Sequence, residues 1–150
     1  MSFEKDFASY EHSVALEGLG FDEKCIATIE NNGYVHIKGT RGLPSAAAVV
    51  NKVDAPLKQQ VFKFFREKYN LRGFIGFRPN VKKFDYHIYD MSLSGMEYVK
   101  QRTMEAYNND PTVGTYDEAE SGCIDKLIEI VAKQQSNTDD TLSKQQDNGQ

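Results

Sequence analysis

A tight-turn signal near the N-terminus most constrains how this chain folds. Asn31-Asn32-Gly33 separates a short apolar run, 25–30, from a second run, 34–38, whose side chains alternate between two faces. Asn and Gly tolerate the positive φ angles that a tight turn between antiparallel strands requires. The sequence therefore predicts an antiparallel hairpin over 25–38.

A second hairpin is predicted further along the chain. One strand covers 72–78, Pro79-Asn80 begins the turn, and the return strand covers 84–91. Because side chains alternate along a strand, the return strand has one apolar face and one mixed face. The first face carries Phe84, Tyr86 and Ile88, and the second carries Asp85, His87 and Tyr89.

Helical spacing of apolar residues predicts four helices around these hairpins. The first covers 10–19 behind the N-cap Ser9, and the second follows Asp54 as its cap and carries an apolar stripe over 57–69. The third is predicted over 95–108. The last runs from 116 to about 133 and begins with the capping box Thr115-Tyr-Asp-Glu118.

The element order α-ββ-α-ββ-α-α indicates an α+β fold in which an antiparallel sheet has helices packed on one face. The length of 150 residues suits a single domain, predicted over 1–133 with an irregular insertion at 39–54. Residues 134–150 carry one Leu and no aromatic residue, so they are predicted to form a disordered polar tail.

Composition limits which cellular compartment and which kinds of partner are expected for this protein. No apolar run approaches the roughly 20 residues that a membrane helix needs, so no membrane partner is expected. The acidic start MSFEKDFASYEH does not resemble a secretory signal peptide. Cys25 and Cys123 are far apart and lie among apolar residues, which indicates two buried thiols in a reducing cytoplasm.

The net charge of −4 hides an uneven distribution. Residues 58–83 contain eight bases and one acid, a net +7, which leaves −11 for the remainder. Aromatic residues are interleaved with these bases. This pattern fits either a surface that binds anions, with rings for stacking, or a solvated helix face and hairpin rim whose aromatic residues form the core.

Under the first interpretation, the ligand-binding candidates lie on the second hairpin and in one glycine-rich loop. Gly39-Thr-Arg41-Gly42 lacks the spacing of a P-loop, but its glycines let the backbone approach a ligand. The predicted ligand-binding residues are Arg41, Arg72, Arg78, Lys82, Lys83, Tyr86, His87 and Tyr89.

The sequence contains no recognised catalytic, metal-binding or cofactor signature, so no catalytic residue, metal or cofactor is predicted. His36 and His87 lie within predicted strands and would converge if the two hairpins shared one sheet. Two-histidine phosphoesterases need Ser or Thr two residues after each His, whereas here Lys38 and Tyr89 occupy those positions.

One resemblance covers about 56–133. The segments Phe64-Phe-Arg-Glu-Lys-Tyr-Asn-Leu71, Phe84-Asp-Tyr-His-Ile-Tyr89 and Tyr116-Asp-Glu-Ala-Glu-Ser-Gly-Cys-Ile-Asp-Lys-Leu127 occur in this order. Together they resemble a helix, a tyrosine-rich hairpin and a closing helix of small accessory proteins from phages and prophages of gut Bacteroidetes. The resemblance implies a phage-like genomic setting rather than an activity. Because such accessory proteins often bind a host component or a defence nucleotide, it favours a binding module.

Three hypotheses follow. The first is a non-enzymatic cytoplasmic binding module, encoded by a phage and directed against host defence, that engages an anionic, nucleotide-like small molecule or a host protein. The alternative is a protein that binds single-stranded nucleic acid through the basic and aromatic hairpin. A further alternative is a nucleotide-processing enzyme that uses His36 or His87. The oligomeric state, including a homo-oligomer, stays open.

Overall fold

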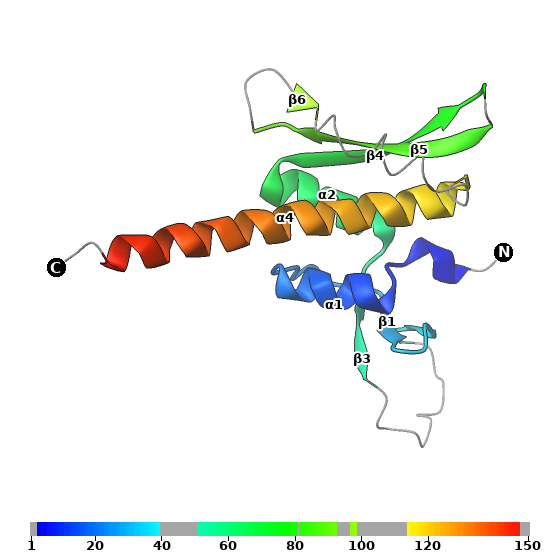
Figure 1. Cartoon of the computed structure of the whole chain (residues 1–150). Helices are drawn as coiled ribbons and strands as arrows, with labels where there is room; N and C mark the ends of the chain where they lie inside the picture. The colour runs from blue at the N-terminus through cyan, green and yellow to red at the C-terminus, as the bar shows by residue number, and fades with distance from the viewer. Residues whose placement is uncertain (1–2, 40–50, 81, 93–96, 99–113, 148–150) are drawn as a thin grey trace. The chain divides into compact units, whose positions relative to one another are not determined.

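The computed structural model describes residues 3–39, 51–80, 82–92, 97–98 and 114–147 (Figure 1). It confirms the α+β class and the antiparallel pairing. The chain divides into two compact units, 1–72 and 73–150. The strands form two three-stranded sheets, ordered β2-β1-β3 and β4-β5-β6, rather than the one sheet expected from the sequence.

The first unit contains the predicted first hairpin, consisting of β1 (Ala27–Glu30) and β2 (Val35–Ile37). The strands pair antiparallel with Ala27 opposite Ile37, and Gly33 in the turn has a φ of 88°. Alternate residues of the sheet, Ala27, Ile29, Val35 and Ala55, form a small core with Phe7. Period-two alternation therefore determined which face of this sheet is buried.

A third strand, β3 (Lys52–Ala55), pairs with the other edge of β1. The sequence placed these residues in an irregular insertion and made Asp54 a helix cap, and both predictions are wrong. Asp54 lies in β3 opposite Thr28, and its carboxylate accepts a hydrogen bond of 2.6 Å from Lys38. Four residues carry too weak a pattern to predict a strand whose stability comes from pairing with β1.

The described part of the first unit also contains three helical segments: η1 (Phe3–Asp6), α1 (Tyr10–Gly18) and α2 (Lys58–Tyr69). The predicted cap of α1 is confirmed, because the Ser9 side chain accepts from the His12 backbone N–H. α2 begins after Leu57, whose backbone N–H donates to the Gln60 side chain at 2.9 Å. It ends at Asn70, which adopts the left-handed conformation.

The second hairpin consists of β4 (Leu71–Arg78), which begins at the end of the first unit, and β5 (Lys83–Asp90). A two-residue strand, β6 (Glu97–Tyr98), pairs with the outer end of β5. The predicted helix over 95–108 is therefore wrong at these two residues, because pairing with β5 overrides the local capping signal. The rest of that prediction lies outside the described residues.

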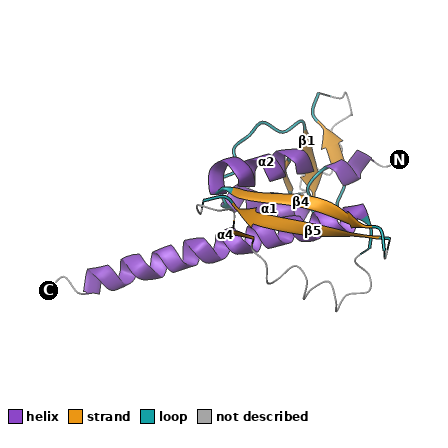
Figure 2. Ribbon diagram, turned by 90° about the horizontal axis from the view of Figure 1, so that it is seen from above, coloured by secondary structure: helices purple, strands orange, loops and turns teal. Residues whose placement is uncertain are grey.

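The last helix, α4 (Tyr116–Asp147), packs against β5 (Figures 1 and 2). Its predicted capping box is confirmed: Thr115 accepts from the Glu118 N–H, and the Glu118 carboxylate accepts from the Thr115 N–H. The sequence predicted a disordered tail from 134, whereas α4 continues to Asp147. No Gly or Pro occurs between 123 and 147 to end the helix, and residues 132–140 are all exposed.

No helix in the described ranges is long and apolar enough to cross a membrane.

Candidate functional site

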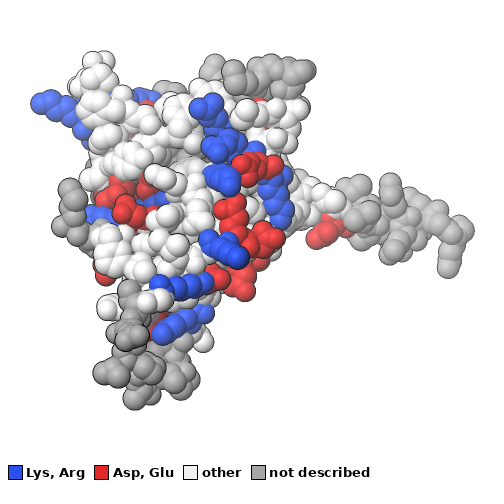
Figure 3. Space-filling view, turned by 180° about the vertical axis from the view of Figure 1, so that it is seen from behind, with Lys and Arg blue, Asp and Glu red and all other residues white. Residues whose placement is uncertain are grey.

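The basic window does not form a uniform basic surface. Half of its eight bases are engaged internally: Lys58 is buried, Lys63 pairs with Glu23 at 3.6 Å, Lys68 donates to the Leu19 carbonyl at 3.1 Å, and Arg78 pairs with Asp85. Figure 3 shows Lys and Arg side chains standing beside Asp and Glu side chains. Half of the bases in the window are therefore held by contacts within the protein.

The predicted site residues that remain accessible gather on the second hairpin. Lys82 is exposed in the turn with a left-handed φ of 53°, and Lys83 begins β5. Neither lysine forms an ion pair with any residue that the structure describes. Arg72 is exposed but is the last residue of the first unit, and Arg41 lies outside the described residues.

Three rings form a stacked group on one face of this hairpin, which we call the ring platform: Phe74, His87 and Tyr89. Phe74 stacks on His87 with ring centroids 5.0 Å apart and planes 16° apart. It also stacks on Tyr89 at 5.5 Å and 6°. Phe74 nevertheless remains 40% exposed. The sequence predicted His87 and Tyr89 on one face, but it did not identify Phe74 as a site residue.

A buried carboxylate lies on the same face. Asp85 is only 4% exposed, its Oδ2 accepts a hydrogen bond from Arg78 Nε, and its Oδ1 lies 2.9 Å from His87 Nε2. A buried carboxylate is costly unless charged or polar donors compensate it, and here two do. Sequence reasoning placed Asp85 on this face without giving it a role, although the spacing Asp85-Tyr-His87 puts both side chains on one side of a strand.

Tyr86 does not join the ring platform, and its predicted role in ligand binding stays a prediction. Its ring faces α4 instead. Tyr86 Cε1 lies so close to Gly122 of α4 that a Cβ added to this glycine would be only 3.2 Å away. Burial in this position, together with the nearby Cys123, raises the pKa of the Tyr86 hydroxyl. The alternation predicted for β5 is thereby confirmed, with Tyr86 on the face opposite His87.

The two strand histidines do not lie in one sheet. His36 lies in β2 of the first sheet and His87 in β5 of the second. His36 Nε2 is 2.8 Å from the Glu30 carboxylate, and this hydrogen bond lowers the pKa of Glu30. Each histidine therefore has its own carboxylate, and the shared-sheet arrangement on which a two-histidine site would depend is absent from the described residues.

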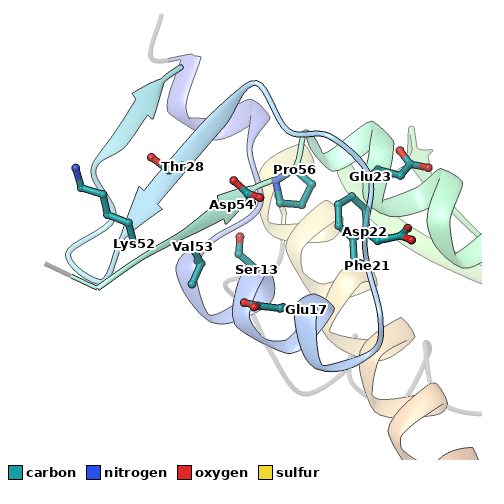
Figure 4. A pocket seen from close by; sticks show the side chains of 10 residues that line it. All are labelled: Ser13, Glu17, Phe21, Asp22, Glu23, Thr28, Lys52, Val53, Asp54 and Pro56. Atoms are coloured by element: carbon teal, nitrogen blue, oxygen red, sulfur yellow. The ribbon is translucent and has the colours of Figure 1, made fainter. Parts of the chain in front are cut away.

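The first unit contains a pocket of about 390 Å³ between α1, the segment after it and β3 (Figure 4). Its charged lining is mainly acidic, with Lys52 as the one base; the acids are Glu17, Asp22, Glu23 and Asp54. None of the predicted ligand-binding residues lines it. Such a lining repels anions, so the pocket does not fit the predicted ligand class.

The described residues contain no group of three or more His, Cys, Asp or Glu side chains placed to hold a metal ion. Comparison with protein-family models, curated proteins and solved structures found no match for the chain. The ring platform, together with Asp85 and the lysines at the turn of the same hairpin, is therefore the candidate site on its geometry alone.

Proposed function

We propose that the second unit is a binding module for an anionic ligand that carries a planar ring, as a nucleotide does. The observation that carries this proposal is the exposed ring of Phe74. A large apolar side chain that is 40% exposed and already ordered by two stacked neighbours offers a preformed stacking surface. A ring held in this way can stack on any nucleobase, because every base has a π-face.

The exposed part of Phe74 is the surface that a ligand ring would contact. Among the described residues, both rings that stack on Phe74 belong to β5, and β4 is the outer strand of the order β4-β5-β6. These contacts leave 40% of Phe74 exposed.

The turn of the hairpin supplies positive charge at a distance from the ring. Phe74 and Arg78 are four residues apart on β4, which corresponds to about 13 Å along an extended strand. Lys82 and Lys83 follow in the turn and at the start of β5. This separation exceeds the span of one sugar between a base and its own phosphate. It therefore favours a ligand with several phosphates or several nucleotides.

A mononucleotide and a single-stranded nucleic acid share this chemistry, and binding measurements distinguish them. A strand that neutralises several phosphates loses affinity with salt at a log–log slope of about −0.7 per phosphate. A nucleoside triphosphate contributes fewer contacts and gives a shallower slope. The resemblance to phage accessory proteins agrees with either ligand, whereas a small ring group offers little area for a stable protein interface.

The first prediction concerns two phenylalanines on opposite faces of β4. Phe74→Ala should weaken binding of a fluorescein-labelled oligothymidylate by about tenfold, because stacking of one base contributes about 1–3 kcal/mol. Phe77→Ala is the matched control: Phe77 is 54% exposed, and its ring contacts Phe84 rather than the ring platform. Fluorescence anisotropy at low salt measures both affinities.

Two results would contradict the proposal. One is the absence of binding to the oligonucleotide and to ATP at low salt. The other is an equal loss of affinity in the Phe74 and Phe77 variants, which would indicate a general change in the hairpin. ATP binding without oligonucleotide binding would assign the site to the small ligand.

A further inference from the structure

We propose that Asp85 is a positioning residue of the ring platform: its buried carboxylate fixes the orientation of the His87 imidazole against Phe74 and holds Arg78 beside it. This inference rests on the proposed function, since it assigns Asp85 a role in binding the same ring-bearing anion. Asp85 itself does not contact the ligand, because only 4% of it is exposed. Its effect must pass through the two side chains that it holds.

The hydrogen bonds of Asp85 determine which ring nitrogen of His87 carries the proton. A carboxylate accepts hydrogen bonds, and its Oδ2 accepts one from Arg78 Nε. At the second oxygen, 2.9 Å from His87 Nε2, the hydrogen must then come from the imidazole. Asp85 thus selects the tautomer of His87 that carries its proton on Nε2.

The orientation of the His87 imidazole is set by two contacts. A histidine on an open strand face can rotate about its side-chain torsions, whereas the His87 ring lies within 16° of the Phe74 plane. The hydrogen bond to Asp85 fixes the ring edge, and the stack on Phe74 fixes the ring face. The two contacts together order the platform before a ligand arrives, which lowers the entropic cost of binding.

Gly76 on β4 leaves space for these two side chains. A Cβ at this position would lie 2.6 Å from Asp85 Oδ1 and 3.1 Å from His87 Nε2. The hairpin therefore combines a glycine, a buried carboxylate and an oriented histidine on one face.

The decisive binding experiment compares two changes that remove the same charge from β5. Asp85→Asn should weaken oligothymidylate binding by about five- to tenfold, as expected when a charge-assisted hydrogen-bond pair is lost. Asp90→Asn is the control: the Asp90 side chain accepts from the Ser92 N–H and has no ring contact among the described residues. Removing a negative charge alone strengthens binding of an anion, so Asp90→Asn should leave the affinity unchanged or raise it.

A spectroscopic measurement on the wild-type protein tests the same role without a ligand, and Asp85→Asn serves as the comparison. The chain has three histidines, so the imidazole ¹⁵N signals are few. At alkaline pH, where each imidazole carries one proton, His87 of the wild-type protein should be the Nε2–H tautomer. In Asp85→Asn that preference should weaken. A wild-type His87 protonated on Nδ1 instead would overturn the inference, even if Asp85→Asn fails to fold.

The two proposals fail in different ways. If neither probe binds, the proposed function fails, while the tautomer still decides whether Asp85 orients His87. If the oligonucleotide binds and Phe74→Ala weakens it, but Asp85→Asn strengthens binding as Asp90→Asn does, then the role of Asp85 fails and the binding site stands.

Discussion

At the scale of single residues, a glycine in β4 makes room for the side chains on one face of the second hairpin. Gly76 faces Asp85 and His87, and the room it leaves lets a carboxylate lie nearly buried between Arg78 and His87. Glycine in a strand interior usually weakens the strand, so its presence there often marks a close approach of other groups. Here the approaching group is the carboxylate that supports the ring platform.

Gly76→Ala should therefore destabilise the protein. The new methyl group must displace Asp85 or His87, both held by hydrogen bonds, and overpacking of this kind costs about 1–3 kcal/mol. Gly18→Ala is the control, since a Cβ there meets nothing within 4 Å and Gly18 lies in α1. Urea unfolding followed by circular dichroism measures both. Equal stability of the Gly76 variant and the wild type would show that Asp85 and His87 can move aside without loss of stability.

At the scale of elements, the sequence predicts correctly those helices and strands whose ends are marked by a capping or turn residue. The hairpin at Gly33, the Ser9 cap and the Thr115–Glu118 capping box are all confirmed. The two short strands β3 and β6 were missed, because each exists through pairing with β1 or β5. Their stability is a property of the partner strand, which sequence periodicity over two to four residues does not reveal.

One charged group on α4 gives a pH dependence to this element. Hydrogen bonds from Lys126 and then Lys133 lower the pKa of Glu129 from its ordinary 4.5 to about 2. A carboxyl group with a lowered folded-state pKa stabilises the fold above its ordinary pKa, and this contribution is lost as the pH falls toward the lowered value. The effect is small because the Glu129 side chain is 42% exposed.

We expect Glu129→Gln to unfold at a slightly lower temperature than the wild type at neutral pH. The difference should shrink as the pH falls from about 4.5 to about 2, the range set by the ordinary and lowered pKa values of Glu129. Thermal unfolding across this range measures it. Lys133→Gln, which removes one of the two donors, should show part of the same loss. A difference that grows toward low pH would refute the assigned cause.

At the scale of the whole molecule, the chain forms two compact units, and each contains one free cysteine. Cys25 lies in the first unit and is 6% exposed, whereas Cys123 lies on α4 and is fully buried. Burial raises the pKa of both thiols, and Cys123 is the more strongly affected. The two thiols therefore report separately on the packing of the two units.

In the native protein, iodoacetamide should label Cys25 faster than Cys123, because the thiolate is the reactive form and Cys123 is both less accessible and less ionised. Mass spectrometry of peptides after timed labelling measures the two rates. Labelling in denaturing urea provides the control, in which both thiols should react at similar rates. Faster labelling of Cys123 in the native state would contradict the packing of α4 in the second unit.

The sequence by itself determined the α+β class, the two hairpins, the faces of β5 and the starts of α1 and α4, because alternation and capping act between residues close in the chain. The tertiary structure shows that the described strands form two sheets, with His36 in one and His87 in the other. It also shows that half of the eight bases in 58–83 have contacts within the protein. Phe74, Asp85 and Gly76 lie together in one cluster. These outcomes depend on contacts across strands and on the space between side chains, which no local pattern encodes.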